Sequence, residues 1–224
     1  MTESPASHAV HHHPDVSIDQ DLALRAAATG LQQEFGDQVG MDTIEKLLHS
    51  SYDHFAARAR IPNFVPLLAE RFARQQLHAV ARIEANVGGG TPTVLFLCTH
   101  NAGHSQMALG FFTHLAGEHA VAWSAGSEPE TEINPSAVQA MSEVGIDISG
   151  EYPKPWTDEI VQAADVVITM GCGDACPVFP GTRYEEWELP DPAGQSMEAV
   201  RPIRDEINHR VRRLLAELDV PVTA

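Results

Sequence analysis

Residues 93–105 read TVLFLCTHNAGHS, an apolar run that leads directly into a loop of small and polar residues. Val94 to Leu97 has the continuous apolar character of a buried parallel strand. From Gln106 to about Leu115 the pattern is that of a helix. A strand, a loop and a helix in this order predict a parallel α/β fold, in which ligands bind beyond the carboxyl ends of the strands.

The loop between this strand and helix is suited to binding an anion. Small residues let successive backbone N–H groups turn inward, and the start of a helix adds positive potential. Asn101 could hold the loop in a conformation that is costly for most residues. We expect the contacts to an oxyanion to come from Thr99, His100, Asn101, Ala102, Gly103 and His104.

Cys98 is the candidate nucleophile, because it stands at the end of the strand and at the start of this loop. A thiolate inside an anion-binding loop is aimed at the central atom of a bound oxyanion. Ser105 could donate a hydrogen bond to the sulfur. The alternative is a buried free cysteine with a structural role only, which is common at strand ends.

The chain beyond this motif continues to alternate strands and helices. Further strands are predicted at 120–123, 165–170 and 187–189, and further helices at 135–144, 158–163 and 196–218. The order predicts an open, mostly parallel four-stranded sheet with helices on both faces.

Cys172 and Cys176 follow the third predicted strand, so we expect them at the same edge of the sheet as Cys98. Three cysteine sulfurs at one edge of the sheet favour a redox role for these thiols. Residues four apart on a helix have Cβ atoms about 5–6 Å apart, so a bridge between Cys172 and Cys176 needs local unwinding. A metal clamp or an inert pair is the alternative, although a structural zinc site usually has four ligands. We expect no metal.

Asp191 precedes Pro192 just after the fourth predicted strand. A carboxyl group at this edge could donate a proton to a departing oxygen. An Asp-Pro turn is also common in loops that have no catalytic role. The catalytic interpretation therefore depends on the position of Asp191 beyond a strand end.

The N-terminal part of the chain has a different pattern. We predict a disordered, histidine-bearing tail over residues 1–19, a three-helix domain over 20–86, a linker over 87–92 and a catalytic domain over 93–224. Asp42 is a candidate cap of the second helix. The three helices hold no catalytic constellation, and a unit with so small a core is expected to bury its remaining apolar surface in a homodimer.

Composition restricts the partners. The formal net charge of −17 argues against nucleic acid and would repel small anions at long range, so an oxyanion site has to be built locally. No apolar stretch is long enough to span a membrane, and no secretory signal is present. Three cysteines suit a reducing compartment, so we expect a cytoplasmic protein.

The segments Cys98 to Ser105, Ser124 to Gly126, Cys172 to Cys176 and Asp191 to Gly194 together resemble the arsenate reductases built on the low-molecular-weight protein tyrosine phosphatase fold. The resemblance covers about Thr93 to Leu218. Residues 41–77 also resemble, more weakly, a three-helix module that precedes such reductases in some actinobacteria.

This resemblance implies a complete reaction. Cys98 attacks arsenate and Asp191 donates a proton as hydroxide leaves. Cys172 then attacks the Cys98 sulfur as arsenite departs, and Cys176 resolves that bond. The remaining Cys172–Cys176 disulfide is reduced by thioredoxin, and no organic cofactor is required.

His104 departs from the family pattern, in which an arginine occupies this position. A histidine offers fewer donors and is only partly protonated near neutral pH. Substrate binding then weakens as pH rises, or another cation such as Lys154 or Arg183 substitutes, or activity is lost. Three other functions remain open, namely a mycothiol-dependent arsenate reductase, a phosphatase of the same fold, and a binder of arsenite or soft metals that uses the three thiolates.

Overall fold

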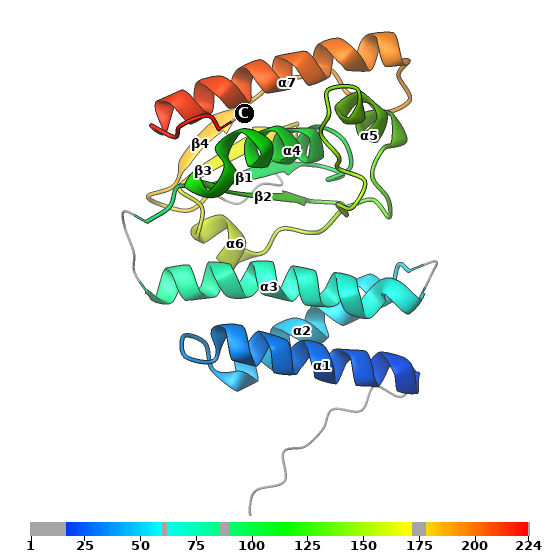
Figure 1. Cartoon of the computed structure of the whole chain (residues 1–224), viewed down its shortest axis with the longest axis vertical. Helices are drawn as coiled ribbons and strands as arrows, with labels where there is room; N and C mark the ends of the chain where they lie inside the picture. The colour runs from blue at the N-terminus through cyan, green and yellow to red at the C-terminus, as the bar shows by residue number, and fades with distance from the viewer. Residues whose placement is uncertain (1–16, 60–61, 86–89, 172–177, 224) are drawn as a thin grey trace, which may run out of the picture.

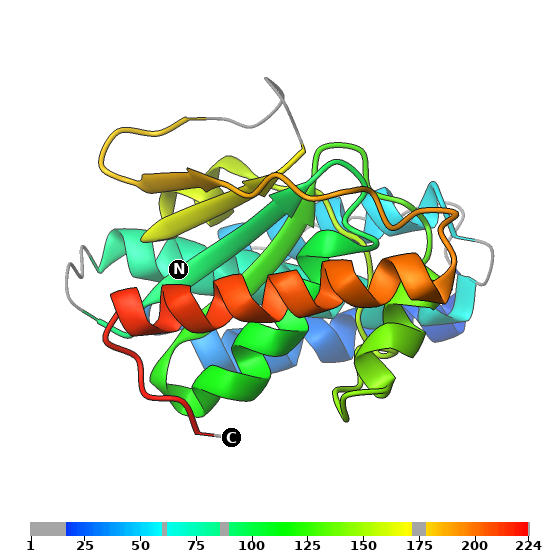
Figure 2. The same cartoon turned by 90° about the horizontal axis from the view of Figure 1, so that it is seen from above.

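A computed structural model describes residues 17–59, 62–85, 90–171 and 178–223. Its sheet has four strands in the order β2-β1-β3-β4, and all neighbouring pairs are parallel. Figure 2 shows the strand arrows pointing the same way. The strands are β1 (Thr93–Cys98), β2 (Val121–Gly126), β3 (Val166–Met170) and β4 (Arg183–Glu186). The predicted fold class is confirmed.

The fourth strand was predicted in the wrong place. We expected it at 187–189, where apolar residues occur, whereas β4 ends at Glu186. An edge strand needs no continuous apolar run, and charged side chains protect its free edge from further pairing. The apolar signal came from Trp187, which lies just beyond the strand, is buried, and donates its backbone N–H to the Thr169 oxygen.

One face of the sheet is covered by α4 (His104–Ala116), α5 (Pro135–Ser142) and α7 (Met197–Glu217). These helices lie on the upper side of the sheet in Figure 1. Side chains alternate along a strand, so Val94, Phe96 and Cys98 of β1 face this layer and join its apolar cluster. A short 3₁₀ helix, η2 (Gly117–His119), links α4 to β2.

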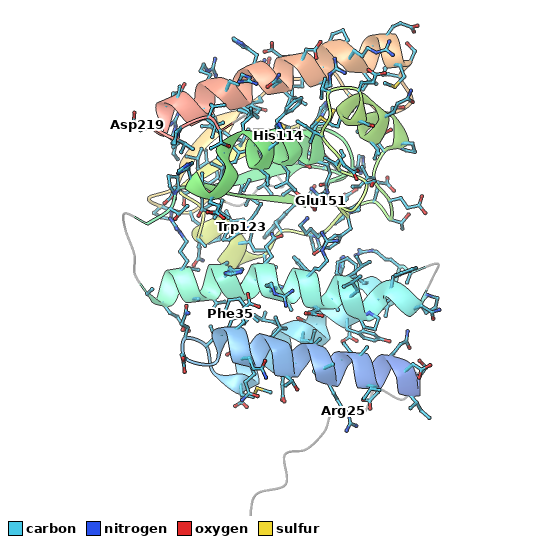
Figure 3. All side chains as sticks on the ribbon, viewed as in Figure 1. Arg25, Phe35, His114, Trp123, Glu151 and Asp219 are labelled. Atoms are coloured by element: carbon cyan, nitrogen blue, oxygen red, sulfur yellow. The ribbon has the colours of Figure 1, made fainter. Side chains whose placement is uncertain are left out.

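The opposite face is covered by α6 (Asp158–Gln162) and α3 (Val65–Glu84), with α1 (Ile18–Phe35) and α2 (Met41–Ala56) packed outside α3. A single apolar cluster runs from these helices to Leu95 and Leu97 of β1. Figure 3 labels two of its members, Phe35 and Trp123, on opposite sides of α3. The predicted helices are therefore present, but they share one core with the sheet.

Specific contacts join the helices to the sheet layer. The ring of Phe55 meets that of Tyr152 edge to face at 5.6 Å, and the Arg71 guanidinium lies over the same tyrosine ring at 4.6 Å. Arg82 donates to Asp165 Oδ2 at 2.7 Å, and that oxygen also accepts the Thr93 backbone N–H at 2.8 Å. The division into two domains stays a prediction.

The starts of the first two helices differ from expectation. Ser17 caps α1 in a reciprocal capping box with Gln20, so the helix begins at Ile18, inside the segment expected to be a tail. Gly40 precedes α2, and Asp42 lies in its first turn instead of capping it. A short 3₁₀ helix, η1 (Pro62–Phe64), leads into α3. The tail up to residue 16 and linker residues 86–89 lie outside the described residues.

Over the described ranges, no helix is both long and apolar enough to cross a membrane.

Candidate active site

Cys98 ends β1 with its thiol held by two polar groups. The Sγ atom lies 3.0 Å from Ser105 Oγ and accepts the backbone N–H of Asn101 at 3.1 Å. Asn101 Nδ2 donates to the same Ser105 oxygen at 2.8 Å, which leaves the hydroxyl hydrogen free to point at the sulfur. These two contacts hold the sulfur in a fixed position at the end of the strand. The contact between Cys98 and Ser105 is as the sequence predicted, and the nucleophilic role of Cys98 stays a prediction.

Asn101 has a positive φ of 49°, as the loop motif suggested. Its side chain is buried and accepts the backbone N–H of Lys154 at 2.9 Å and Gln106 Nε2 at 3.2 Å through the same Oδ1 atom. Gln106 Nε2 also donates to the Asn101 and Tyr152 carbonyl oxygens. Asn101 therefore supports the loop from its buried side.

Two glycines let neighbouring segments approach this loop. A Cβ atom on Gly126, at the end of β2, would lie 2.7 Å from the Thr99 oxygen and 3.0 Å from the Asn101 nitrogen. A Cβ atom on Gly103 would lie 2.9 Å from Pro192 Cγ. Any side chain at either position would push the loop away from its neighbour.

The loop opens into a pocket of about 400 Å³. The pocket wall brings together most of the predicted site residues, namely Cys98, Thr99, His100, Ala102, Gly103, His104 and Asp191. Asn101 and Ser105 do not line the pocket and are both buried. Glu130 and Glu132 add two carboxylates that sequence reasoning missed. Within the described ranges the wall contains no lysine or arginine, so its basic side chains are histidines.

His100 and Asp191 are both exposed on this wall. His100 Nδ1 lies 3.3 Å from the Glu128 carbonyl oxygen and 3.8 Å from Glu130 Oε1. Asp191 Oδ1 accepts the Ala193 backbone N–H at 2.9 Å, which fixes the turn that presents this carboxyl group.

His104 begins α4, and its Nε2 atom lies 2.8 Å from the Pro190 carbonyl oxygen. A carbonyl oxygen only accepts, so Nε2 carries the hydrogen. Burial lowers the pKa of this imidazole below its ordinary value, although the hydrogen bond to Pro190 and the nearby Asp191 carboxylate act in the opposite direction. The ring therefore contacts the rest of the protein through Nε2.

Neither of the two substitute cations lines the pocket. Arg183 lies at the opposite end of the sheet, at the start of β4, where it pairs with Glu185 and Glu217. Lys154 is buried beneath the loop, and its Nζ donates to Ser124 Oγ at 3.2 Å and to the Tyr152 carbonyl oxygen at 3.3 Å. Burial lowers the pKa of Lys154 to about 8. Its role as a structural support was not predicted.

Cys172 and Cys176 lie outside the described residues, so their predicted meeting with Cys98 stays a prediction. The chain that leads to Cys172 is described. Gly171 is on the pocket wall, and its carbonyl oxygen accepts the Thr99 hydroxyl at 2.9 Å. Among the described side chains, no three His, Cys, Asp or Glu residues are grouped as a metal ion would require.

The chain belongs to the low molecular weight phosphotyrosine protein phosphatase family, whose model matches residues 93–223. Residues 24–81 match a second model, described as a protein-tyrosine-phosphatase-like N-terminal domain. Family membership and the helical module ahead of the catalytic fold are as the sequence resemblance implied.

Relatives within this family include arsenate reductases. The chain is 39% identical over 125 residues to arsenate reductase 2 of Staphylococcus saprophyticus, a match that covers 54% of this chain and 94% of that protein. It is 39% identical over 128 residues to the glutaredoxin arsenate reductase of Synechocystis, covering 56% and 97%. A solved thioredoxin-dependent arsenate reductase from Corynebacterium glutamicum is 40% identical, with a TM-score of 0.78, and the match covers 88% of this chain and 96% of that one.

Proposed function

We propose that this chain reduces arsenate to arsenite at Cys98 and passes the oxidation through Cys172 and Cys176 to thioredoxin. The observation that carries the proposal is the Cys98 sulfur, which receives donors from Asn101 and Ser105 on the floor of a pocket whose wall includes Asp191. The enzyme class is that of an arsenate reductase, which is also the class of the Staphylococcus saprophyticus relative and of the solved Corynebacterium glutamicum relative.

The reaction begins with an arsenate oxyanion in the loop. The Cys98 thiolate attacks arsenic, and an arsenic-bound hydroxyl group takes a proton from Asp191 and leaves as water, while Asp191 becomes a carboxylate. Cys172 thiolate then attacks the Cys98 sulfur. The electron pair of the Cys98–arsenic bond stays on arsenic, which leaves as arsenite, and a Cys98–Cys172 disulfide remains.

The relay continues by thiol–disulfide exchange. Cys176 thiolate attacks the Cys172 sulfur, which releases Cys98 and leaves a Cys172–Cys176 disulfide for an external dithiol to reduce. The position of Gly171 on the pocket wall supports the first exchange, because it is the residue directly before Cys172. Such a relay works in a reducing compartment such as the cytoplasm.

Two versions of this function differ in the external reductant, which is either thioredoxin or mycothiol. The solved Corynebacterium glutamicum relative is named for thioredoxin, which supports the thioredoxin route. With mycothiol, the small thiol would attack the arsenic adduct on Cys98 directly, and Cys176 would be dispensable.

Arsenate-dependent oxidation of NADPH tests both. We expect turnover with thioredoxin and thioredoxin reductase and none with the mycothiol system, while Cys98→Ser should be inactive with either. Activity with mycothiol alone would refute the thioredoxin route. No arsenate turnover with either reductant, together with hydrolysis of an aryl phosphate, would assign the chain the phosphatase activity after which its family is named.

A homodimer through the N-terminal helices is part of the proposal. The exposed apolar side chains there include Ile18, Leu22, Phe64 and Leu67. The start of α1 lies close to η1, because Gln20 Nε2 donates to the Pro62 oxygen at 2.9 Å. Light scattering of the full chain tests the dimer, and Leu22→Glu should give a monomer.

A further inference from the structure

Two successive residues of the loop, Gly103 and His104, contact the residues on either side of Asp191. The imidazole of His104 donates to the carbonyl oxygen of Pro190, which precedes Asp191. Gly103 lies against Pro192, which follows Asp191, so closely that a Cβ atom would meet its ring at 2.9 Å. Pro192 is buried, whereas Asp191 between these contacts is exposed on the pocket wall.

The hydrogen bond to Pro190 conflicts with a role for His104 as an anion clamp. A neutral imidazole has one N–H, and here that N–H is on Nε2 and is used by the carbonyl oxygen. The remaining nitrogen, Nδ1, then has no hydrogen to offer an oxyanion. An arginine has five donors and could contact a carbonyl and an anion together, so the exchange of arginine for histidine changes what this position is able to do.

We propose that His104 is a positioning residue that fastens the Pro190–Pro192 turn to the start of α4 and so holds Asp191 at the pocket that contains Cys98. This inference rests on the proposed function, in which Asp191 supplies a proton to the departing oxygen. The backbone N–H groups of the loop bind the oxyanion, and His104 acts on the chemical step through Asp191.

Two measurements on the full chain test this role. Hydrogen exchange of residues 188–194 reports the tether without any substrate, because loss of the bond opens the turn. His104→Ala should exchange faster in this segment. His104→Gln, whose amide N–H can reach Pro190, should restore most of the protection. His114→Ala, an exposed change at the other end of α4 (Figure 3), should exchange like the wild type.

Arsenate kinetics test the consequence. General acids typically contribute about 10²–10⁴-fold to a rate, so loosening one is expected to lower kcat about tenfold in His104→Ala, with little change in KM. His104→Gln should recover kcat to within about threefold of the wild type, because it keeps the donor without any charge. In an Asp191→Asn background, His104→Ala should lower kcat little further, because the carboxyl group that His104 positions is already absent.

Opposite results would overturn the inference. A rise in KM at constant kcat in both His104→Ala and His104→Gln, with unchanged exchange of residues 188–194, would make His104 an anion clamp. Full additivity of the His104 and Asp191 changes would also refute positioning. If the wild-type chain does not turn over arsenate, the proposed function and the positioning role both fail, whereas the exchange data still decide whether the tether exists.

Discussion

The backbone N–H of Lys154 donates to Oδ1 of Asn101 at 2.9 Å, across 53 residues of sequence. Lys154 also accepts the backbone N–H of Gly126 through its carbonyl oxygen at 2.9 Å. The segment that follows β2 in the chain therefore supports both the end of that strand and the loop from Cys98 to Ser105. The shape of this loop depends on this distant support as well as on its own sequence.

Two substitutions of Asn101 separate its side-chain bonds from its backbone conformation. Both Asn101→Gly and Asn101→Ala remove the contacts to Ser105, Gln106 and Lys154. Only alanine adds strain at a φ of 49°, by about 1 kcal/mol. We expect both to lower the free energy of unfolding in urea, alanine by the larger amount. Equal losses would show that the positive φ carries no strain.

Gly126 and Gly150 form a matched pair for the close approach beneath the loop. Gly126→Ala places a methyl group 2.7 Å from the Thr99 oxygen, whereas a Cβ on Gly150 meets nothing within 4 Å. Overpacking typically costs about 1–3 kcal/mol, so Gly126→Ala should lower both stability and arsenate turnover. Gly150→Ala should stay within about 0.5 kcal/mol of the wild type. Normal activity in Gly126→Ala would mean that the loop has room to shift.

Burial of Lys154 predicts a pH dependence of stability. Its folded-state pKa of about 8 is below the ordinary 10.5, because burial disfavours the ammonium. Between these values the unfolded chain holds a proton that the folded chain has lost, so the free energy of unfolding should rise with pH across this window. We expect the rise to be on the order of 1–3 kcal/mol.

The Lys154→Met variant should lack this rise. Urea unfolding at pH 7.5 and 9.5 measures it, and the contributions of other groups cancel when the two proteins are compared. The other lysine of the sequence, Lys46, is exposed on α2, so Lys46→Met should behave like the wild type. An identical pH response in Lys154→Met would contradict the assignment to Lys154.

The cysteine relay predicts a trapped intermediate. Cys176→Ser removes the thiol that resolves the first disulfide, so arsenate should convert this variant to a Cys98–Cys172 disulfide after a single turnover. Mass spectrometry of the digested protein detects the linked peptides. Cys98→Ser should give no such product. Normal cycling of Cys176→Ser with thioredoxin would disprove the relay.

Local patterns predicted the geometry around Cys98 well. Cys98, Ser105 and the positive φ of Asn101 lie within eight residues of each other, and a strand, a loop of small residues and a helix are enough to set their geometry. The parallel sheet was also predicted, because strands that alternate with helices along the chain form parallel sheets.

Long-range partners were not predictable in this way. Pro190 lies 86 residues from His104, and nothing in a histidine near a helix start indicates which carbonyl oxygen it will meet. Lys154 was considered only as a substitute cation, because a lysine between two prolines gives no sign of burial. The three N-terminal helices showed their apolar faces clearly, but not that the sheet would cover one of them.

The shared apolar cluster sets an order of events during synthesis. Helices α1–α3 leave the ribosome before β1 and β2, yet the inner face of α3 belongs to the cluster that Leu95, Leu97, Trp123 and Ala125 complete. Until about residue 126 has emerged, the nascent chain presents this face to solvent and to other chains. Folding of the N-terminal helices to their final packing therefore waits for the strands, and during this delay the exposed apolar face is a site of aggregation.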